Sequence, residues 1–199
     1  MDKTQLIENI VEKEWRQFTQ VNNQGGRAAC QDDRVTFDIM RKSQFMTWTD
    51  DLLKSYANDL AEAEAKGWSL LAEKYARMMI STAPKEYELL KDQLPFRSQE
   101  RQQKEQSLVA MQVDWLEKVY RQYPRLAQSG RPVHSWQDTP WATSFETYQR
   151  GELGTYSDRT LELYENMLRS IREQGGNLAE MTLENTARFY GYGGLEDLK

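Results

Sequence analysis

The chain has 199 residues and a formal net charge of −5, with acidic and basic residues intermixed along its whole length. No Lys/Arg-rich run is present, which argues against a nucleic-acid or anionic-membrane surface. Hydrophobic residues make up 39% of the chain and include six Trp, ten Tyr and six Phe. This is enough apolar material to build the core of one compact domain.

The beginning of the chain and its cysteine content bear on the compartment. Residues 1–15 mix charged and apolar side chains, and no stretch approaches the roughly 20 apolar residues that span a bilayer. The single cysteine, Cys30, rules out an internal disulfide framework. We therefore expect a cytoplasmic protein with neither a signal peptide nor a membrane segment.

Helical patterns begin at the N-terminus. A first helix is indicated by an apolar stripe at helical spacing, formed by Ile7, Val11, Trp15 and Phe18. Thr4 is its expected cap, and the glycine pair in 22–29 breaks it. Asp32 or Asp33 then caps a second helix, whose inward residues are Phe37, Met40 and Phe45.

Two more helices follow, and then a connector. Thr49 caps the third helix and Gly67 ends it, while residues 70–79 form the fourth. A short fifth helix at 85–94 is bracketed by prolines. The polar run 98–107 then leads into a helix with an apolar face of Leu108, Met111, Trp115 and Val119.

The last third of the chain is predicted to be helical after a long irregular segment. Pro124 stops the preceding helix, and 125–143 shows no regular pattern, which is often the mark of a functional loop. Ser157 caps the next helix and Gly175 closes it. Asn177 caps the final helix.

Two parts of the sequence also resemble each other. Residues 11–18 match 116–123 at an offset of 105, and 36–67 match 144–175 at an offset of 108. We therefore predict an all-α fold of eight to ten helices in two pseudo-symmetric halves, 1–83 and 108–199, joined by a connector at 84–107. Two such halves would pack about a pseudo-twofold axis, and their interface is the natural place for a pocket.

The residue inventory excludes several chemistries. One histidine, His134, cannot supply the two Glu-x-x-His motifs of a carboxylate-bridged di-metal bundle, and one Cys with one His cannot form a zinc site. We expect no resident metal, and no cofactor is indicated. A nucleophilic pair of Cys30 and His134 stays open, because the two occupy matching places in the repeats.

Arg41 and Gln44 place a guanidinium and an amide beside the apolar face of the second helix. A buried arginine needs a strong acceptor, because leaving it unpaired is costly. That acceptor is either an anionic ligand or a protein carboxylate, the candidates being Glu12, Asp32, Asp33 and Glu146. An internal ion pair and a ligand site are both consistent with the sequence.

Two equivalent loops form the strongest polar cluster. The first runs from Gly25-Gly26-Arg27 to Asp32, and the second from Gly130-Arg131 to Asp138, with Trp136, Pro140 and Trp141 added. Arginine offers a fork for anions, and aspartate caps the following helix. The loops are therefore either capping structures with local ion pairs or the two sides of a shared cleft.

Two function hypotheses follow. The first is a site for a small polar or anionic ligand between the halves, formed by Arg27, Asp32, Arg41, Gln44, Arg131, Trp136, Trp141 and Glu146. The second is a helical interaction protein, an accessory subunit or a homodimer, with aromatic residues as anchors. An enclosed pocket containing these polar groups would favour the first, and an exposed apolar patch would favour the second.

Several strings resemble a bacterial family, domain of unknown function 4125. They occupy 26–33, 40–45, 73–79, 81–84, 143–148 and 150–153. The resemblance runs the full length of the chain. It implies a bacterial, cytoplasmic, stand-alone protein, and it implies no reaction and no catalytic residues.

Overall fold

The computed structural model describes residues 2–22, 26–139 and 141–199, so Gly25 and Pro140 of the predicted loops lie outside the described part. Within these ranges the chain forms ten α-helices and no strand, apart from an isolated bridge between Thr139 and Ala142. The all-α class is therefore confirmed. The helices are α1 (Lys3–Phe18), α2 (Arg34–Phe45), α3 (Asp50–Ala65), α4 (Leu70–Thr82), α5 (Pro84–Leu90), α6 (Gln99–Gln122), α7 (Pro124–Ser129), α8 (Phe145–Leu153), α9 (Asp158–Glu173) and α10 (Leu178–Phe189).

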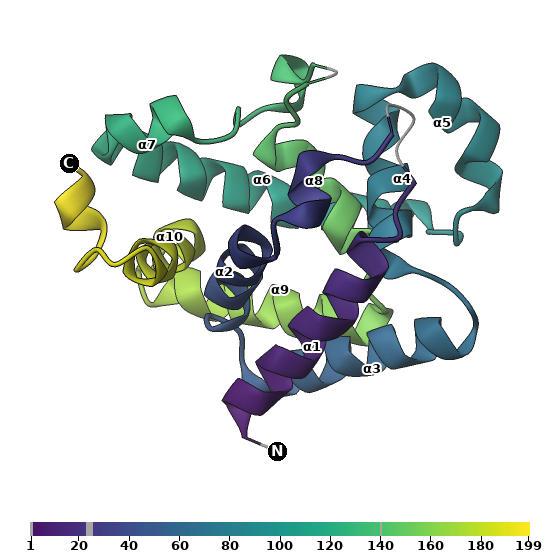
Figure 1. The fold of residues 1–199 in the computed structure, drawn as a ribbon, viewed down its shortest axis with the longest axis horizontal. Helices are drawn as coiled ribbons and strands as arrows, with labels where there is room; N and C mark the ends of the chain where they lie inside the picture. The colour runs from purple at the N-terminus through teal and green to yellow at the C-terminus, as the bar shows by residue number, and fades with distance from the viewer. Residues whose placement is uncertain (1, 23–25, 140) are drawn as a thin grey trace.

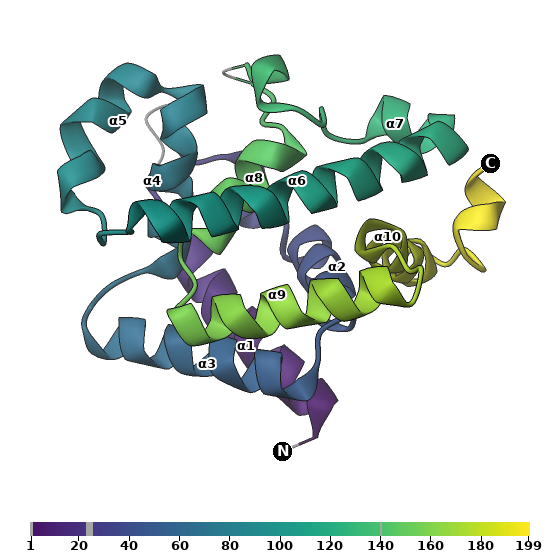
Figure 2. The ribbon, with the colours of Figure 1, turned by 180° about the vertical axis from the view of Figure 1, so that it is seen from behind.

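The helices surround α8 and α2, which lie near the middle of the molecule (Figure 1). The long helix α6 crosses one side, with α9 below it in the view from behind (Figure 2). Helix α5 projects at the edge beside α4, and the C-terminal 3₁₀ turn Leu195–Leu198 follows α10 at the opposite edge. In the described ranges, none of the helices combines the length and the apolar character that crossing a membrane requires.

Short-range signals account for most helix boundaries. Thr49, Ser157 and Asn177 each accept a first-turn backbone N–H through their side chains, as predicted. The prediction for α1 was wrong, because Asp2 rather than Thr4 is its N-cap. Of the two candidates before α2, Asp33 is the cap.

The segments predicted to be irregular contain more helix than expected. Helix α6 begins at Gln99, so it includes most of the polar run assigned to the connector. The segment 125–143 contains most of α7 and a 3₁₀ turn at Ser135–Gln137. The long polar side chains of 98–107 are good helix formers. Most of them are exposed on α6, whereas Glu105 is buried and pairs with Arg101.

The core is centred on Trp48, which is 1% exposed. Its ring lies 5.6 Å from that of Tyr56 and 5.6 Å from that of Tyr164, and it also contacts Phe45 and Tyr156. Aromatic pairs at these separations add to the stability that comes from burying their area. This aromatic cluster joins the end of α2 to helices α3 and α9.

Elements that the duplication relates have matching registers. Helices α3 and α9 each contain 16 residues and begin 108 positions apart. Helices α4 and α10, of 13 and 12 residues, also begin 108 positions apart. Helix α4 packs on α8, and α10 packs on α2. These registers agree with the offset seen in the sequence, and the duplication itself stays a prediction.

Candidate functional site

A cavity of about 460 Å³ lies among α2, α4, α6, α8 and α10. Much of its wall is apolar, and residues of this kind include Phe37, Met40, Leu116 and Leu183. Charged and amide side chains also line it: Asp33, Arg41, Gln44, Lys74, Gln112, Arg131, Gln149 and Glu152. Both segments assigned to repeats, 1–83 and 108–199, contribute to the lining.

Arg41 is held by two carboxylates and an amide. Its Nε and Nη2 atoms donate to the two oxygens of Glu14 at 2.7 and 2.6 Å. Its Nη1 donates to Gln44 Oε1 at 2.7 Å, and Nη1 and Nη2 both reach Glu152 at 3.1 Å. The arginine predicted to need a strong acceptor thus has two, and neither is one of the four candidates named from the sequence.

Glu152 lines the cavity and accepts hydrogen bonds from side chains of α2, α4 and the segment between α8 and α9. Besides Arg41, it accepts from Lys74 Nζ at 2.6 Å, Gln44 Nε2 at 2.9 Å and the Tyr156 hydroxyl at 3.1 Å. Its side chain is 5% exposed. Two carboxylates and two cations therefore form a charge-balanced buried cluster, which we call the buried ion network: Glu14, Arg41, Lys74 and Glu152.

The ionisation states in this network are fixed by its charges. Burial alone would raise the pKa of Glu152, but Arg41 and Lys74 outweigh it and hold that pKa well below the ordinary value. Burial would likewise lower the pKa of Arg41, and the two carboxylates reverse the shift. At neutral pH, Glu152 is thus a firm anion, which suits a structural or electrostatic role and not that of a proton donor.

Helical spacing brings the network together. Glu14 continues the buried stripe of α1, which includes Ile7, Ile10, Val11 and Phe18. Lys74 lies among the buried residues of α4, and Gly151 lets α4 approach α8 closely. A Cβ at Gly151 would lie 2.8 Å from the Lys74 carbonyl oxygen. The sequence signal that was missed is a charged residue at stripe spacing on each helix.

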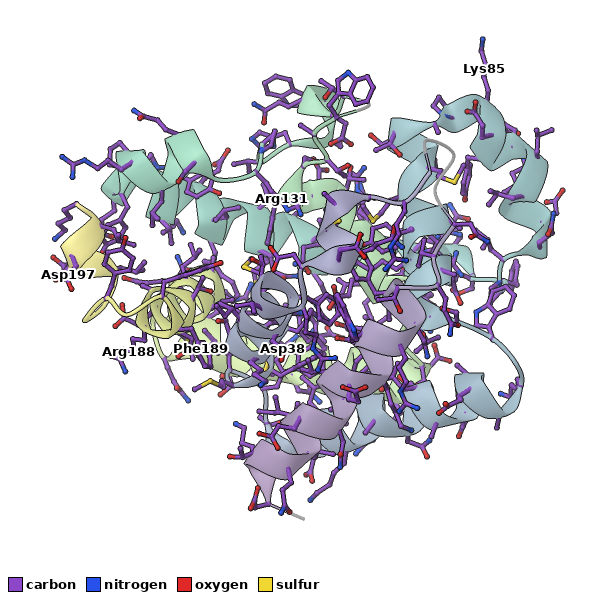
Figure 3. The ribbon with its side chains drawn as sticks, viewed as in Figure 1. Asp38, Lys85, Arg131, Arg188, Phe189 and Asp197 are labelled. Carbon is purple, nitrogen blue, oxygen red and sulfur yellow. The ribbon has the colours of Figure 1, made fainter. Side chains whose placement is uncertain are left out.

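A second group of side chains surrounds the ring of Tyr148. The Arg131 guanidinium carbon lies 4.0 Å from the ring centroid, and Lys74 Nζ lies 5.0 Å from it. Figure 3 shows Arg131 beside α2 in the region that α6 and α8 border. The Tyr75 and Tyr148 rings meet edge to face, with their centroids 6.2 Å apart. Burial, followed by the neighbouring Tyr148, raises the pKa of Tyr75, so its hydroxyl stays protonated at neutral pH.

Of the eight predicted site residues, the structure places three in this cavity: Arg41, Gln44 and Arg131. Arg27 and Asp32 are exposed and pair with each other, Nε to Oδ1 at 2.8 Å. Arg27 also donates to the carbonyl oxygens of Thr19 and Gln31. The first polar loop is thus closed by local bonds, and Arg27 does not face Arg131 across a cleft.

The other three predicted residues do not line this cavity: Trp136 and Trp141 lie in the segment before α8, and Glu146 lies in the first turn of α8. Trp136 is 79% exposed and Trp141 is 93% exposed, so neither walls the cavity. Glu146 accepts the Ser135 backbone N–H at 2.7 Å. Asp138 anchors the loop by accepting from Ser144 N and Thr147 Oγ1 at 2.6 and 2.5 Å.

Cys30 and His134 lie in different environments. Cys30 lines the main cavity, whereas His134 lines a second hollow of about 230 Å³ and contacts Glu117, Nε2 to Oε1 at 2.8 Å. The arrangement brings no histidine to the cysteine. Among the described residues, no group of three or more His, Cys, Asp and Glu side chains is arranged to hold a metal ion.

The fold defines an all-helical protein with a cavity among five of its helices. The family model described as "Protein of unknown function (DUF4125)" matches residues 4–199. The chain therefore belongs to this family, in agreement with the resemblance found in the sequence. No curated protein and no solved structure matches the chain.

Proposed function

We propose that this protein binds a small polar or anionic organic molecule in the cavity among α2, α4, α6, α8 and α10. The observation that carries the proposal is the cavity itself, which has about 460 Å³ of space and contains Arg41, Gln44 and Arg131. Ligand sites typically have volumes of about 300–1,000 Å³ and combine apolar walls with a few fixed polar groups. A cavity that contains several of these polar residues, although it is partly open to solvent, is the feature that favours a ligand site over an interaction module.

The buried ion network gives the site a rigid floor. Arg41 and Glu152 use their hydrogen-bonding groups on each other and on neighbouring residues, so they hold α1, α2, α4 and α8 together. A floor of fixed dipoles and charges orients a ligand at little cost, since it does not reorganise on binding. We further propose that the cavity lies between two repeated halves of a cytoplasmic, bacterial protein.

The test uses a variant that fills the cavity. Thr182 lines it from α10, whereas neighbouring Met181 is 40% exposed and is not part of the lining. We would compare wild type, Thr182→Trp and Met181→Trp by native mass spectrometry and by thermal shift with a panel of anionic metabolites. Far-ultraviolet circular dichroism would check that the variants keep the helical fold.

The proposal expects a bound mass or a ligand-induced rise in Tm for wild type and Met181→Trp. Both effects should be lost in Thr182→Trp, because the indole occupies the ligand volume. A clean mass with no rise in Tm for any compound, or a rise equally large in Thr182→Trp, would overturn the proposal.

The second candidate function is protein interaction, and the exposed tryptophans favour it. Trp136 and Trp141 lie on a loop that Asp138 fixes, and such aromatic residues are often anchors at interfaces. If this function is correct, sedimentation analysis should show a dimer or a stable complex. The double variant Trp136→Ala with Trp141→Ala should dissociate it. A monomer at all concentrations and no bound partner would remove it.

A further inference from the structure

Some polar side chains that line the cavity already form all their hydrogen bonds within the protein, and others do not. This difference indicates which residues could bind a ligand. Arg41 has five N–H groups, and its bonds to Glu14, Gln44 and Glu152 account for all of them. Glu152 accepts from four different side chains. These two residues are structural, so a ligand would find its partners elsewhere in the lining.

Arg131 has guanidinium N–H groups that are available to a ligand. Among the described residues it forms no ion pair, and the one acceptor for its guanidinium is the Thr143 carbonyl oxygen, 3.3 Å from Nη1. Its guanidinium carbon is 4.0 Å from the Tyr148 ring centroid. Stacking on an aromatic face holds the guanidinium in place and leaves its in-plane N–H groups available.

Lys74 reaches the same ring and also has donors to spare. One of its three N–H groups is bonded to Glu152, and the ammonium lies 5.0 Å from the Tyr148 centroid. The residue is only 7% exposed. Buried N–H donors are costly to leave unpaired, so an acceptor near Tyr148 would be favoured by both cations at once.

The charges of the side chains around the cavity indicate the charge of the ligand that it would bind. Glu14 and Glu152 neutralise Arg41 and Lys74 within the buried ion network. The cavity's other carboxylate, Asp33, is exposed and caps α2 by accepting the Thr36 N–H at 3.0 Å. Arg131 is exposed as well, but no carboxylate among the described residues pairs with it. Its single positive charge beside Tyr148 matches a monoanion better than a phosphate dianion.

We infer that Lys74 and Arg131, both of which contact the Tyr148 ring, bind the carboxylate of an otherwise largely apolar small molecule. The inference deepens the proposed function, on which it rests. The ligand's apolar body would lie against the remaining wall, where Phe37, Met40, Leu116 and Leu183 are found. Carboxylate oxygens would accept from the spare guanidinium and ammonium N–H groups, the strongest kind of hydrogen bond in proteins.

The experiment compares three probes with one apolar body and different head groups: octanoate, octanamide and octyl phosphate. Isothermal titration calorimetry on the full chain would measure Kd for wild type and Arg131→Gln. Arg125→Gln is the matched control, because Arg125 is exposed on neighbouring α7 and does not line the cavity. Thr182→Trp reports whether a probe occupies the cavity at all.

Octanoate should bind most tightly, and Arg131→Gln should weaken it by about 10–100-fold, as expected for losing a hydrogen bond to a charged group. Arg125→Gln should leave its Kd unchanged. The double variant Lys74→Met with Glu152→Gln removes the ammonium while keeping the floor neutral, and it should also weaken octanoate without altering octanamide binding.

Three results would overturn the inference, and they separate it from the proposed function. Equal binding of octanamide and octanoate, both blocked by Thr182→Trp, would refute the carboxylate subsite and leave cavity binding standing. Tighter binding of octyl phosphate than of octanoate would refute the assignment of a monoanion. No binding by any probe, together with a clean native mass, would refute both.

Discussion

The buried ion network makes Arg41→Met the most informative single change for stability. The Arg41 side chain is 11% exposed, and its carboxylate partners are less so, Glu14 at 0% and Glu152 at 5%. Removing the guanidinium leaves two buried carboxylates with Lys74 as the network's one cation. Removing one partner from a buried ion pair costs about 3–5 kcal/mol. At about 2–4 °C per kcal/mol for a domain of this size, Tm should fall by roughly 6–20 °C.

Urea unfolding at neutral pH, followed by circular dichroism, measures this loss. The matched control is Arg159→Met on α9, whose side chain is 66% exposed in its pair with Glu162, and it should lose less than about 1 kcal/mol. Adding Glu14→Gln to Arg41→Met restores the charge balance and should recover part of the loss. The reasoning fails if Arg41→Met is no worse than the control, or if the second change deepens the loss.

Three further outcomes are expected. Gly151→Ala should lose at least about 1 kcal/mol in urea unfolding despite alanine's helix propensity, because its Cβ would lie 2.8 Å from the Lys74 carbonyl oxygen; an unchanged midpoint would contradict the close crossing of α4 and α8. Tyr56→Phe should cost about 1.5–3 kcal/mol, since the Tyr56 hydroxyl donates to buried Glu14 at 2.7 Å; a smaller loss would show that Glu14 does not need this donor. The pKa of Glu152 is held well below its ordinary 4.5 because the neighbouring cations outweigh burial, so its contribution to stability is present above about pH 4.5 and is lost as pH falls below it. The free energy of unfolding, measured from pH 7 to pH 3, should therefore vary less with pH in Glu152→Gln than in wild type. Parallel pH dependences would refute the assignment.

The features that sequence predicted well are those decided by neighbouring residues. Thr49, Ser157 and Asn177 cap helices because a side-chain oxygen lies next to an unpaired backbone N–H, whatever the rest of the fold. Gly67 and Gly175 take φ values of +66° and +72° just after α3 and α9, a conformation that glycine adopts without strain. Short-range chemistry of this kind is visible in a single sequence.

The buried ion network was missed because its partners are set by packing between helices. Arg41 was seen to need an acceptor, but Glu14 is 27 positions away and Glu152 is 111. The candidate chosen on α1, Glu12, is half-exposed and instead pairs with Arg34. The spacing of the apolar residues of α1 distinguishes the two glutamates. Glu14 continues the 3–4 spacing, which predicts that it is buried, and Glu12 does not.

Residue type was a poor guide in the two polar loops. Trp136 and Trp141 were expected to wall a cleft because tryptophan is usually at least partly buried, yet they are 79% and 93% exposed. Arg27 and Arg131 occupy similar loop positions, but Arg27 is tied to Asp32 while Arg131 lies over Tyr148. The direction of an arginine in a loop depends on contacts that the sequence leaves open.

The predicted duplication aligns positions 44 and 152 at its offset of 108, and one carries Gln while the other carries Glu. The buried ion network gives a physical reason for this difference. Their side chains meet, with Gln44 Nε2 donating to Glu152 Oε1 at 2.9 Å. A glutamate at both positions would place two carboxylates in contact and leave the network with three anions for two cations. A glutamine at both would leave Lys74 without its carboxylate, so one of each is the combination that satisfies both the hydrogen bond and the charge balance.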